Sequence, residues 1–412
     1  VQPPDGNHLE ESGGDGGMKW EKVKLGDIAT FSNGINFNKT AYAKGIKLIG
    51  VSNFGDRFYP DYSQLQEVKK DIVRLEDCLR NGDIVFVRSN GNKELVGRCM
   101  LIKNPTERVT YSGFCIRARL NDTDRYDPVY FTYYFKSKAF RRAVSGTAVG
   151  ANIQNLSQAR LSNHECRIPS IEVQHRIADI LSVYDNLIEN NQKQIKLLEE
   201  AAQRLYKEWF VDLNFPGNEN TKIVDGVPEG WNEKTLSQVA DVIMGQSPKS
   251  EFYNSEKKGL PFHQGVGSYG VRFVMDDIYS TSYTRIAEPN SILFSVRAPV
   301  GRLNITKNKV VIGRGLAAIN QADGCQSYLY YLLKNRFFKD NIVGNGSIFA
   351  SVSKDELLNQ KFLIPERNLM MQFEKIVSQM DKQIENLDSK NKKLIEARDR
   401  LLPKLMSGEV EV

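Results

Sequence analysis

With 412 residues, 41% of them hydrophobic and 26% charged, the chain has the composition of an ordinary soluble protein and the length of two or more domains. It contains no apolar run of the roughly 18 residues that a membrane-spanning helix requires. No secretory signal peptide is visible, so a cytoplasmic location is expected. The cysteine count of five is odd and Cys-x-x-Cys is absent, which disfavours disulfide frameworks and zinc sites, and four histidines predict no His-rich metal site.

Residues 1–17, VQPPDGNHLEESGGDGG, combine many Gly with an absence of Lys and Arg. We interpret them as an expression tag or a disordered arm that precedes a natural start at Met18. From Met18 onward, 56 basic and 46 acidic residues give a net charge of +10. This balance favours a polyanionic partner but is not diagnostic of one.

The first half of the chain is predicted to hold a globular domain followed by a long helix. In 18–167, short β-rich runs such as DIVFVRS and RCMLI alternate with turns, and an amphipathic helix is predicted near 128–144. In 168–212, apolar or small residues recur from Leu181 to Trp209 at alternating steps of four and three, which is typical of a coiled-coil seam. A helix of about 33 residues would be roughly 50 Å long.

The second half of the chain repeats the first. A linker rich in Gly, Pro and Asn, at 213–230, leads into a second β-rich domain at 231–363, with a helix near 326–343, and then into a second long helix and tail at 364–412. The strand GDIVFVRSNG is echoed by NSILFSVRAP, and both long helices carry Asp-x-x-Ile-Glu-Asn. The second helix also repeats the steps of four and three, from Phe373 to Leu405, and so predicts a second seam. A repeat of this length predicts a duplicated two-part unit and not a solenoid.

These elements predict an α+β fold with two similar domains, each a small twisted sheet with helices, separated by two long helices. Because a single modest linker joins the halves, we expect the helices to form an antiparallel coiled coil with a pseudo-twofold axis. Asn191, Asn391 and Arg398 interrupt the seams. If the helices pair about their midpoints, Asn191 lies opposite Asn391, and we predict that this buried Asn pair specifies the register at some cost in stability.

Three motifs look catalytic but fit other roles better. DPVY at 127–130 resembles part of an amino-methyltransferase motif, but it lacks the second Pro and a Gly-rich cofactor loop, and a helix N-cap followed by Pro explains it more simply. GVGSYG at 265–270 has no helical pattern after it, as a dinucleotide loop would require. PDYSQLQEVK at 60–69 is too tightly spaced for a nuclease site. We therefore expect no catalytic residue, cofactor or metal in this chain.

Several segments closely resemble one family. IPSIEVQHRIADILS, YKEWFVDLNFPG, EGWNEKTLSQVAD and the terminal LLPKLMSGEV are similar to the specificity subunit of type I restriction–modification enzymes, and the resemblance covers essentially everything after Met18. It implies a non-catalytic subunit whose two domains, the target recognition domains, each read one half of a bipartite double-stranded DNA target. It also implies that the helices form a spacer that docks two modification subunits, which bind S-adenosylmethionine, and that restriction subunits add ATP- and Mg-dependent chemistry.

Base readout needs Arg, Lys, Asn and Gln at groove edges, and phosphate contact needs basic or small hydroxyl side chains. In the first domain the loops with such residues offer Asn33, Asn36, Asn38, Lys39, Arg88, Asn90, Asn92, Lys93, Arg98, Thr147, Asn152 and Gln154. In the second domain they offer Gln246, Ser247, Lys249, Gln264, Tyr269, Arg272, Arg297, Arg302, Asn345 and Ser347. Arg88 and Arg297 end strands that we align with each other. Because a shared position does not explain different sequence preferences, we assign both to phosphate or scaffold contacts.

Two other interpretations stay open. A coiled-coil adaptor with two protein-binding domains would explain the duplication and the helices equally well, but it explains the basic balance and the amide- and Gly-rich loops less well. A self-contained methyltransferase would need a complete cofactor motif. DNA binding with and without partners, its salt dependence, and bound S-adenosylmethionine on the isolated chain would separate these interpretations.

Overall fold

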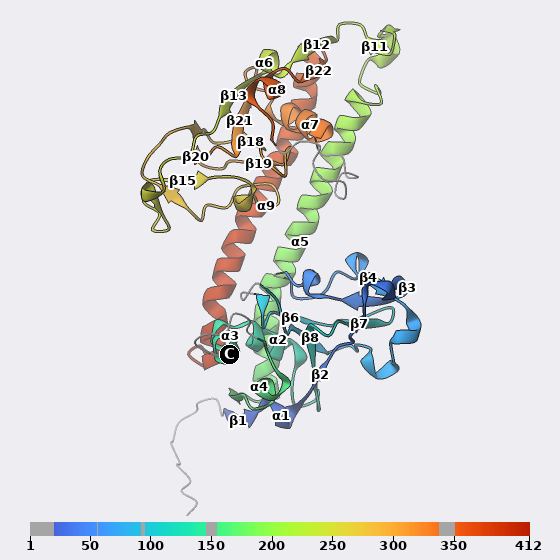
Figure 1. Cartoon of the computed structure of the whole chain (residues 1–412), viewed down its shortest axis with the longest axis vertical. Helices are drawn as coiled ribbons and strands as arrows, with labels where there is room; N and C mark the ends of the chain where they lie inside the picture. The colour runs from blue at the N-terminus through green and yellow to red at the C-terminus, as the bar shows by residue number, and fades with distance from the viewer. Residues whose placement is uncertain (1–19, 56, 92–94, 146–154, 338–350) are drawn as a thin grey trace, which may run out of the picture. The chain divides into compact units, whose positions relative to one another are not determined.

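The computed structural model describes residues 20–55, 57–91, 95–145, 155–337 and 351–412 (Figure 1). It divides into unit 1, which comprises Val1–Asn190 with Lys390–Val412, and unit 2, which comprises Asn191–Ser389. Each unit contains one domain and part of both long helices, α5 (Ile171–Phe210) and α9 (Arg367–Ser407). The described residues include no helix that is long and apolar enough to cross a bilayer, and no group of acidic, His or Cys side chains suited to a metal ion.

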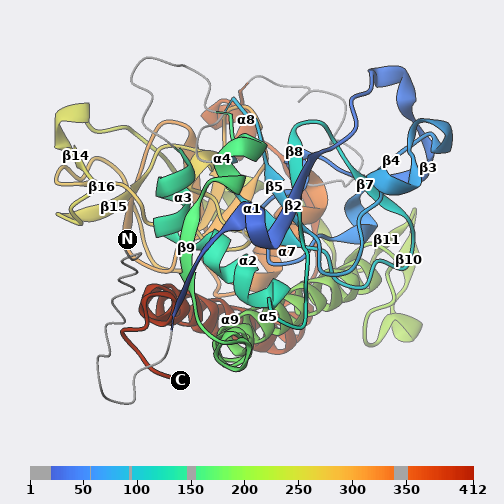
Figure 2. The ribbon, with the colours of Figure 1, turned by 90° about the horizontal axis from the view of Figure 1, so that it is seen from below.

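The domain of unit 1 is built on a four-stranded antiparallel sheet in the order β2-β8-β5-β6, together with a three-stranded sheet in the order β4-β3-β7. A separate pair, β1 with β9, leads the chain into α5. The strands are β1 (Glu21–Lys24), β2 (Ala29–Asn33), β3 (Tyr42–Ile49), β4 (Gln66–Val68), β5 (Ile84–Val87), β6 (Cys99–Leu101), β7 (Val109–Tyr111), β8 (Cys115–Leu120) and β9 (Glu165–Ile168). The short helices are α1 (Leu25–Ile28), α2 (Pro128–Lys136), α3 (Lys138–Ser145) and α4 (Gln158–Ser162), and α1 and α4 lie beside β2 (Figure 2).

The domain of unit 2 repeats this plan with a four-stranded sheet in the order β13-β21-β18-β19 and a five-stranded sheet in the order β14-β16-β15-β20-β17. The pair β12 with β22 leads into α9, as β1 with β9 leads into α5. The strands are β10 (Ile223–Val224), β11 (Val227–Pro228), β12 (Asn232–Thr235), β13 (Ala240–Met244), β14 (Tyr253–Asn254), β15 (Leu260–His263), β16 (Tyr279–Ser280), β17 (Ile286–Ala287), β18 (Ile292–Ser295), β19 (Leu303–Ile305), β20 (Val310–Ile312), β21 (Leu316–Gln321) and β22 (Lys361–Ile364). The short helices are α6 (Leu236–Val239), α7 (Gln326–Phe337) and α8 (Lys354–Leu358).

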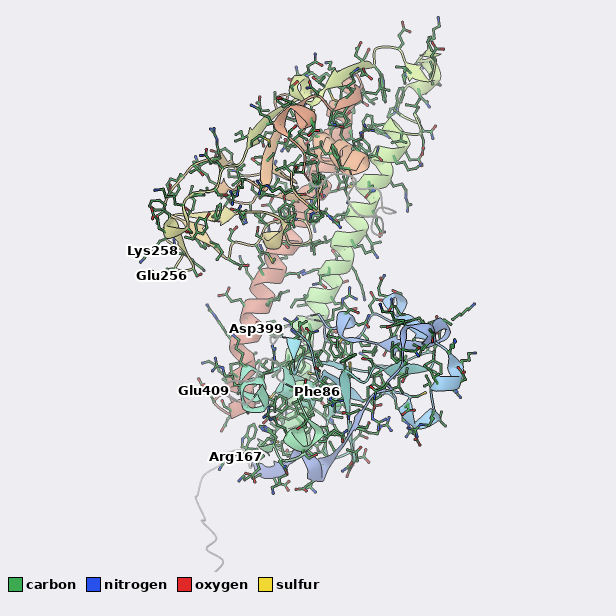
Figure 3. All side chains as sticks on the ribbon, in the orientation of Figure 1. Phe86, Arg167, Glu256, Lys258, Asp399 and Glu409 are labelled. Atoms are coloured by element: carbon green, nitrogen blue, oxygen red, sulfur yellow. The ribbon has the colours of Figure 1, made fainter. Side chains whose placement is uncertain are left out.

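The predicted duplication and the α+β class are confirmed at the level of single positions. Phe86 in β5 and Phe294 in β18 occupy the same place, each in an inner strand of a four-stranded sheet, and neither side chain is exposed. Figure 3 shows Phe86 inside its domain, whereas Glu256 and Lys258 form an ion pair on an outer loop. The apolar core of each domain therefore follows one plan, and the exposed loops differ.

The seams of both long helices are confirmed by burial, since each predicted position from Leu181 to Trp209 and from Phe373 to Leu405 is buried or half-buried. In unit 1, the first half of α5 and the last half of α9 share one apolar cluster, which includes Leu181 and Leu405. In unit 2 the opposite halves meet, and the ring centroids of Trp209 and Phe373 are 5.9 Å apart. The helices are thus antiparallel within each unit, and each buried Leu, Ile or Phe stabilises this packing by about 1.5–3 kcal/mol.

The helix predicted near 128–144 is interrupted, and this part of the prediction was wrong. Ser137 takes an extended conformation (φ −62°, ψ 144°) that ends α2, and its Oγ accepts the Phe140 N–H at 3.2 Å at the start of α3. At the other end of α2, Asp127 Oδ1 accepts the Val129 N–H at 2.9 Å, with Pro128 in the first helical position. The interpretation of DPVY as a helix cap is therefore confirmed.

Candidate nucleic-acid interface

In both domains, a glycine just after the first strand of the four-stranded sheet lies against a neighbouring backbone segment. A Cβ on Gly34, after β2, would lie 2.2 Å from the Tyr111 carbonyl oxygen, and a Cβ on Gly245, after β13, would lie 2.2 Å from the Gly313 carbonyl oxygen. Only glycine fits at such a distance. The close approach brings the loop after β2 or β13 next to the turn before β8 or β21, and polar side chains gather there.

In the first domain, Asn36, Arg88 and Phe114 gather around Gly113, and we call these four residues the first polar cluster. Arg88 Nη1 donates to the Gly113 carbonyl at 3.2 Å, and the Arg88 backbone N–H donates to the Phe114 carbonyl at 2.8 Å. A Cβ on Gly113 would lie 2.0 Å from Asn36 Oδ1, so the glycine makes room for this amide. Phe114 is 63% exposed. The cluster therefore brings together an amide, a guanidinium and an aromatic face around the turn before β8.

In the second domain, the corresponding turn gathers Gln246, Ser247, Gln264 and Arg314, which we call the second polar cluster. Ser247 Oγ donates to Gln264 Oε1 at 2.7 Å and accepts the Arg314 backbone N–H at 3.2 Å. The Gln246, Gln264 and Arg314 side chains are exposed. Amide and guanidinium groups are the side chains that read adenine and guanine edges in the major groove of DNA. The two clusters thus place different recognition chemistry on the same scaffold position.

Phe114 and Arg314 are members of these clusters that the sequence did not predict. The signal available was the segments SGF (112–114) and GRG (313–315), where a glycine stands beside a large side chain directly before a strand. A turn residue of this kind is exposed unless tertiary contacts cover it. The structure shows that none of the described residues covers Phe114 or Arg314.

The remaining predicted contact residues fall into three groups. Asn33, Asn38, Lys39, Lys249 and Arg297 are exposed, and Asn38 Oδ1 also accepts the Thr40 N–H at 3.0 Å. Asn90, Arg98 and Arg302 are half-buried. Asn92, Lys93, Thr147, Asn152, Gln154, Asn345 and Ser347 lie outside the described residues. The pairing of Asn191 with Asn391 stays a prediction, since these two residues belong to different units.

The prediction that Arg272 contacts DNA was wrong. Its side chain is 2% exposed and pairs with Glu199 of α5 and Asp381 of α9, while its guanidinium carbon lies 3.8 Å from the centroid of the Tyr330 ring. An arginine held in this way has no free face for a base edge. The Tyr269 hydroxyl is buried, and burial raises the pKa of this group, but the residue as a whole is half-buried. A DNA contact through its aromatic ring stays a prediction.

The alignment of Arg88 with Arg297 was also wrong, by one residue. Arg88 N–H donates to the carbonyl of Phe114, and the same bond in the second domain runs from Val296 N–H to the carbonyl of Gly315. Val296, and not Arg297, therefore corresponds to Arg88. A shift of one residue turns a side chain to the opposite face of a strand. The two arginines accordingly differ, since Arg88 is half-buried and Arg297 is exposed.

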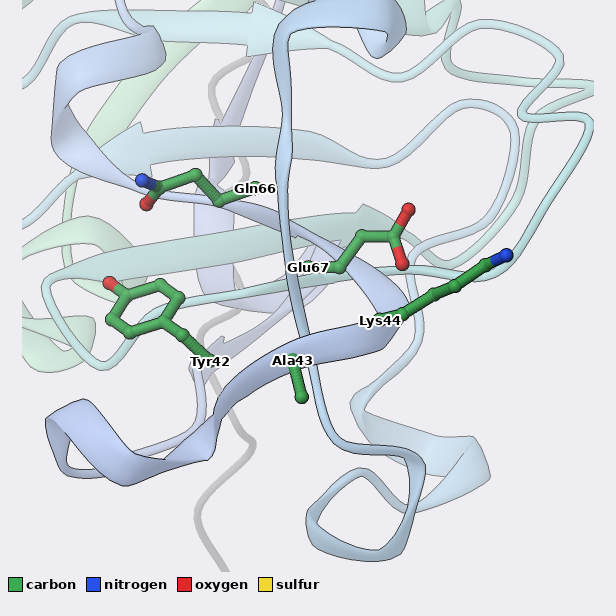
Figure 4. Close-up of a pocket in the computed structure, with 5 residues that line it drawn as sticks. All are labelled: Tyr42, Ala43, Lys44, Gln66 and Glu67. Carbon is green, nitrogen blue, oxygen red and sulfur yellow. The ribbon is translucent and has the colours of Figure 1, made fainter.

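A hollow of about 410 Å³ lies on the β3–β4 pair of the first domain (Figure 4). Its lining residues are Tyr42, Ala43, Lys44, Gln66 and Glu67. Glu67 Oε2 accepts the Gly45 N–H at 2.6 Å, across the bulge between Tyr42 and Ile46. The Glu67 carboxylate therefore stabilises the bulge of β3, which is a structural role.

Comparison with known proteins agrees with the duplicated architecture. The family model described as type I restriction modification DNA specificity domain matches twice, over residues 18–200 and 228–397. The chain belongs to this family. Among its relatives, the type I restriction enzyme MjaIX specificity subunit of Methanocaldococcus jannaschii is 28% identical over 77% of this chain and 76% of its own length.

A second relative, the type I restriction enzyme HindI specificity subunit of Haemophilus influenzae, is 23% identical over 95% of this chain and 99% of its own length. Among solved structures, the S subunit of a type I restriction–modification system from M. genitalium matches with a TM-score of 0.55 and 18% identity. That match covers 97% of this chain and 98% of the other. At this level of identity the structural match supports the fold of the specificity family and no finer property.

Proposed function

We propose that this chain is the DNA sequence-recognition subunit of a type I restriction–modification complex, and that each of its domains reads one half of a bipartite target in double-stranded DNA. The observation that carries the proposal is the pair of polar clusters. They occupy the same place on a duplicated scaffold, yet the first offers Asn36 and Phe114 for base contacts, with Arg88 for a phosphate, and the second offers Gln246, Gln264 and Arg314. A shared scaffold with different side chains is what two readers of different half-sites require.

We further propose that the chain is not itself an enzyme. The family consists of specificity domains, and the DPVY segment, which resembles a catalytic motif, caps helix α2 through Asp127. S-adenosylmethionine, ATP and Mg would then be bound by modification and restriction subunits, and the chain itself would bind neither a cofactor nor a metal. The complex would act in the cytoplasm, where its DNA is found.

Helix α5 offers a surface for such partners. Val183 and Leu187 are one turn apart on α5, and their side chains are 56% and 44% exposed. Residues four apart share one face of a helix, so these two form an apolar strip that a partner helix can cover. We propose that a modification subunit docks here.

Selection from random duplexes tests the proposal. The full chain, reconstituted with its modification subunits, is incubated with a pool of random double-stranded DNA, and the retained duplexes are sequenced. The proposal predicts a split motif with two defined halves. A stable complex that enriches no sequence would contradict it and would favour the protein-binding adaptor.

A further inference from the structure

In unit 2, Arg272 connects the recognition domain to both long helices. It follows Val271, which is 87% exposed, yet Arg272 itself is 2% exposed. Its Nη2 donates to Asp381 Oδ1 on α9, and its Nη1 contacts Glu199 Oε1 on α5 at 3.4 Å. The same nitrogen lies 3.2 Å from the hydroxyl of Tyr331 on α7. Four elements of unit 2 therefore meet at one guanidinium, which has fixed planar geometry.

Lys307 makes a second connection to the same helix. Its Nζ donates to Asp388 Oδ2 at 2.7 Å and to Ser389 Oγ at 2.9 Å, and it lies 4.4 Å from the centroid of the Phe273 ring. The Lys307 side chain is 16% exposed. Asp381 and Asp388 are seven residues apart, so they lie on the same face of α9, two turns from each other. The domain is thus held to α9 at two points about 10 Å apart along the helix axis.

The first domain uses part of the same arrangement. Tyr133 and Tyr331 occupy equivalent places in the duplicated sequence, as do Asp185 and Asp381. In unit 1 the Tyr133 hydroxyl donates to Asp185 Oδ2 at 2.6 Å, and in unit 2 the Tyr331 hydroxyl lies 3.4 Å from Asp381 Oδ1. The cation differs, however: in unit 1 it is Arg398 of α9 itself, and in unit 2 it is Arg272 of the recognition domain. The second domain alone therefore supplies its own arginine to the helix carboxylate.

Apolar contact between a domain and a helix is non-directional, so it tolerates a small rotation of the domain. Charge-assisted hydrogen bonds are directional, and two of them at separate points oppose such a rotation. The rotation matters for a reader of split sites because neighbouring base pairs are only about 3.4 Å apart along the duplex. A displacement of the recognition surface by about this distance would place it over the neighbouring base pair.

We propose that Arg272 and Lys307 are positioning residues that hold the second recognition domain at one angle on α9, and so set the number of base pairs between the two half-sites. The inference rests on the proposed function, because it requires a bipartite target. The number of base pairs between the half-sites would then depend on contacts between the second domain and α9, in addition to the length of the helices.

The test compares Lys307→Met, Asp388→Asn and Arg272→Met with wild type and with the control Lys309→Met. Lys309 pairs with Glu288 on the surface, where both side chains are about half exposed or more, at 49% and 64%. Each full chain is assembled with its modification subunits and offered duplexes that carry both selected half-sites at a series of gap lengths. Arg272→Lys keeps the charge without the planar fork, so it separates the charge of this residue from its geometry.

We expect wild type and Lys309→Met to retain a single gap length. We expect Lys307→Met, Asp388→Asn and Arg272→Met to retain duplexes with one base pair more or fewer at one tenth or more of the main species, with the half-site bases unchanged. If Arg272→Met does not assemble, the other two variants decide. Assembled variants that keep the single wild-type gap would overturn the inference while leaving the proposed function standing. A wild-type complex that retains no split motif would overturn both.

Discussion

Replacement of Arg398 by Met tests whether the ion pair on the helices of unit 1 stabilises that unit. Arg398 Nη1 pairs with Asp185, and these side chains are only 21% and 18% exposed. Tyr133 donates a further hydrogen bond to the same carboxylate at 2.6 Å. In Arg398→Met, the Asp185 carboxylate keeps its tyrosine partner but loses its counter-ion in a mostly buried place.

Breaking a fully buried ion pair costs about 3–5 kcal/mol, whereas an exposed pair contributes about 0–1 kcal/mol. Since both side chains retain about a fifth of their exposure, we expect a loss of about 2 kcal/mol in the free energy of unfolding. For a unit of about 200 residues, this corresponds to a fall in Tm of about 4–8 °C. Thermal unfolding of the full chain, followed by calorimetry, measures it.

Arg400→Met is the matched control on the same helix. Arg400 pairs with Glu396, but both side chains are well exposed, at 77% and 60%, so the loss should stay below about 0.5 kcal/mol. The double variant Asp185→Asn with Arg398→Met should recover most of the loss, because it removes the unpaired charge. Equal Tm values for Arg398→Met and Arg400→Met would refute this reasoning. So would a double variant whose loss of stability equals the sum of the losses measured for Asp185→Asn alone and Arg398→Met alone.

Three further predictions concern the recognition clusters and one histidine. Arg88→Ala should weaken binding to all DNA sequences alike. If Arg88 contacts one phosphate, binding titrations at several salt concentrations should show the slope of log K against log salt reduced by about 0.9. A loss of affinity confined to one DNA sequence would contradict this prediction. Arg314→Ala should cost about 1–3 kcal/mol of discrimination at one base of one half-site, and selection with the variant should leave the other half-site intact. Burial lowers the pKa of His164, whose Nε2 lies 2.8 Å from the Tyr134 hydroxyl oxygen. Because the unfolded chain takes up a proton near the ordinary pKa of about 6.5 and the folded chain only at lower pH, stability should fall as the pH drops below about 6.5. In His164→Gln that part of the fall should be absent in denaturant titrations at pH 7.5 and 5.5; an unchanged pH dependence would contradict the assignment.

The long helices could be predicted from the sequence because their signal is local. Apolar residues at steps of three and four define one face of a helix wherever it packs, and the positions from Leu181 to Trp209 are accordingly buried or half-buried. The duplication was also visible, since equivalent strands such as those with Phe86 and Phe294 keep the same core residues. The order of the strands in each sheet was not predictable, because it depends on pairings between residues far apart in the chain.

The candidate site was predicted less completely than the fold. Arg272 looked like a surface base in a Gly-rich loop, and its burial depends on acids from two helices that lie 73 and 109 residues away in the sequence. Phe114 and Arg314 were missed because their exposure depends on how two segments approach one another at Gly34 and Gly245. The one-residue error in aligning Arg88 with Arg297 arose because hydrogen bonds between strands, and not residue identity, define equivalent positions.

The central claim is that each domain reads its own half of a split DNA site. The most direct measurement is selection from random duplexes with the assembled complex, carried out in parallel for wild type, Asn36→Ala and Arg314→Ala. The account predicts a split motif for wild type, a changed first half alone for Asn36→Ala and a changed second half alone for Arg314→Ala. A motif without a gap, or variants that alter both halves together, would contradict it.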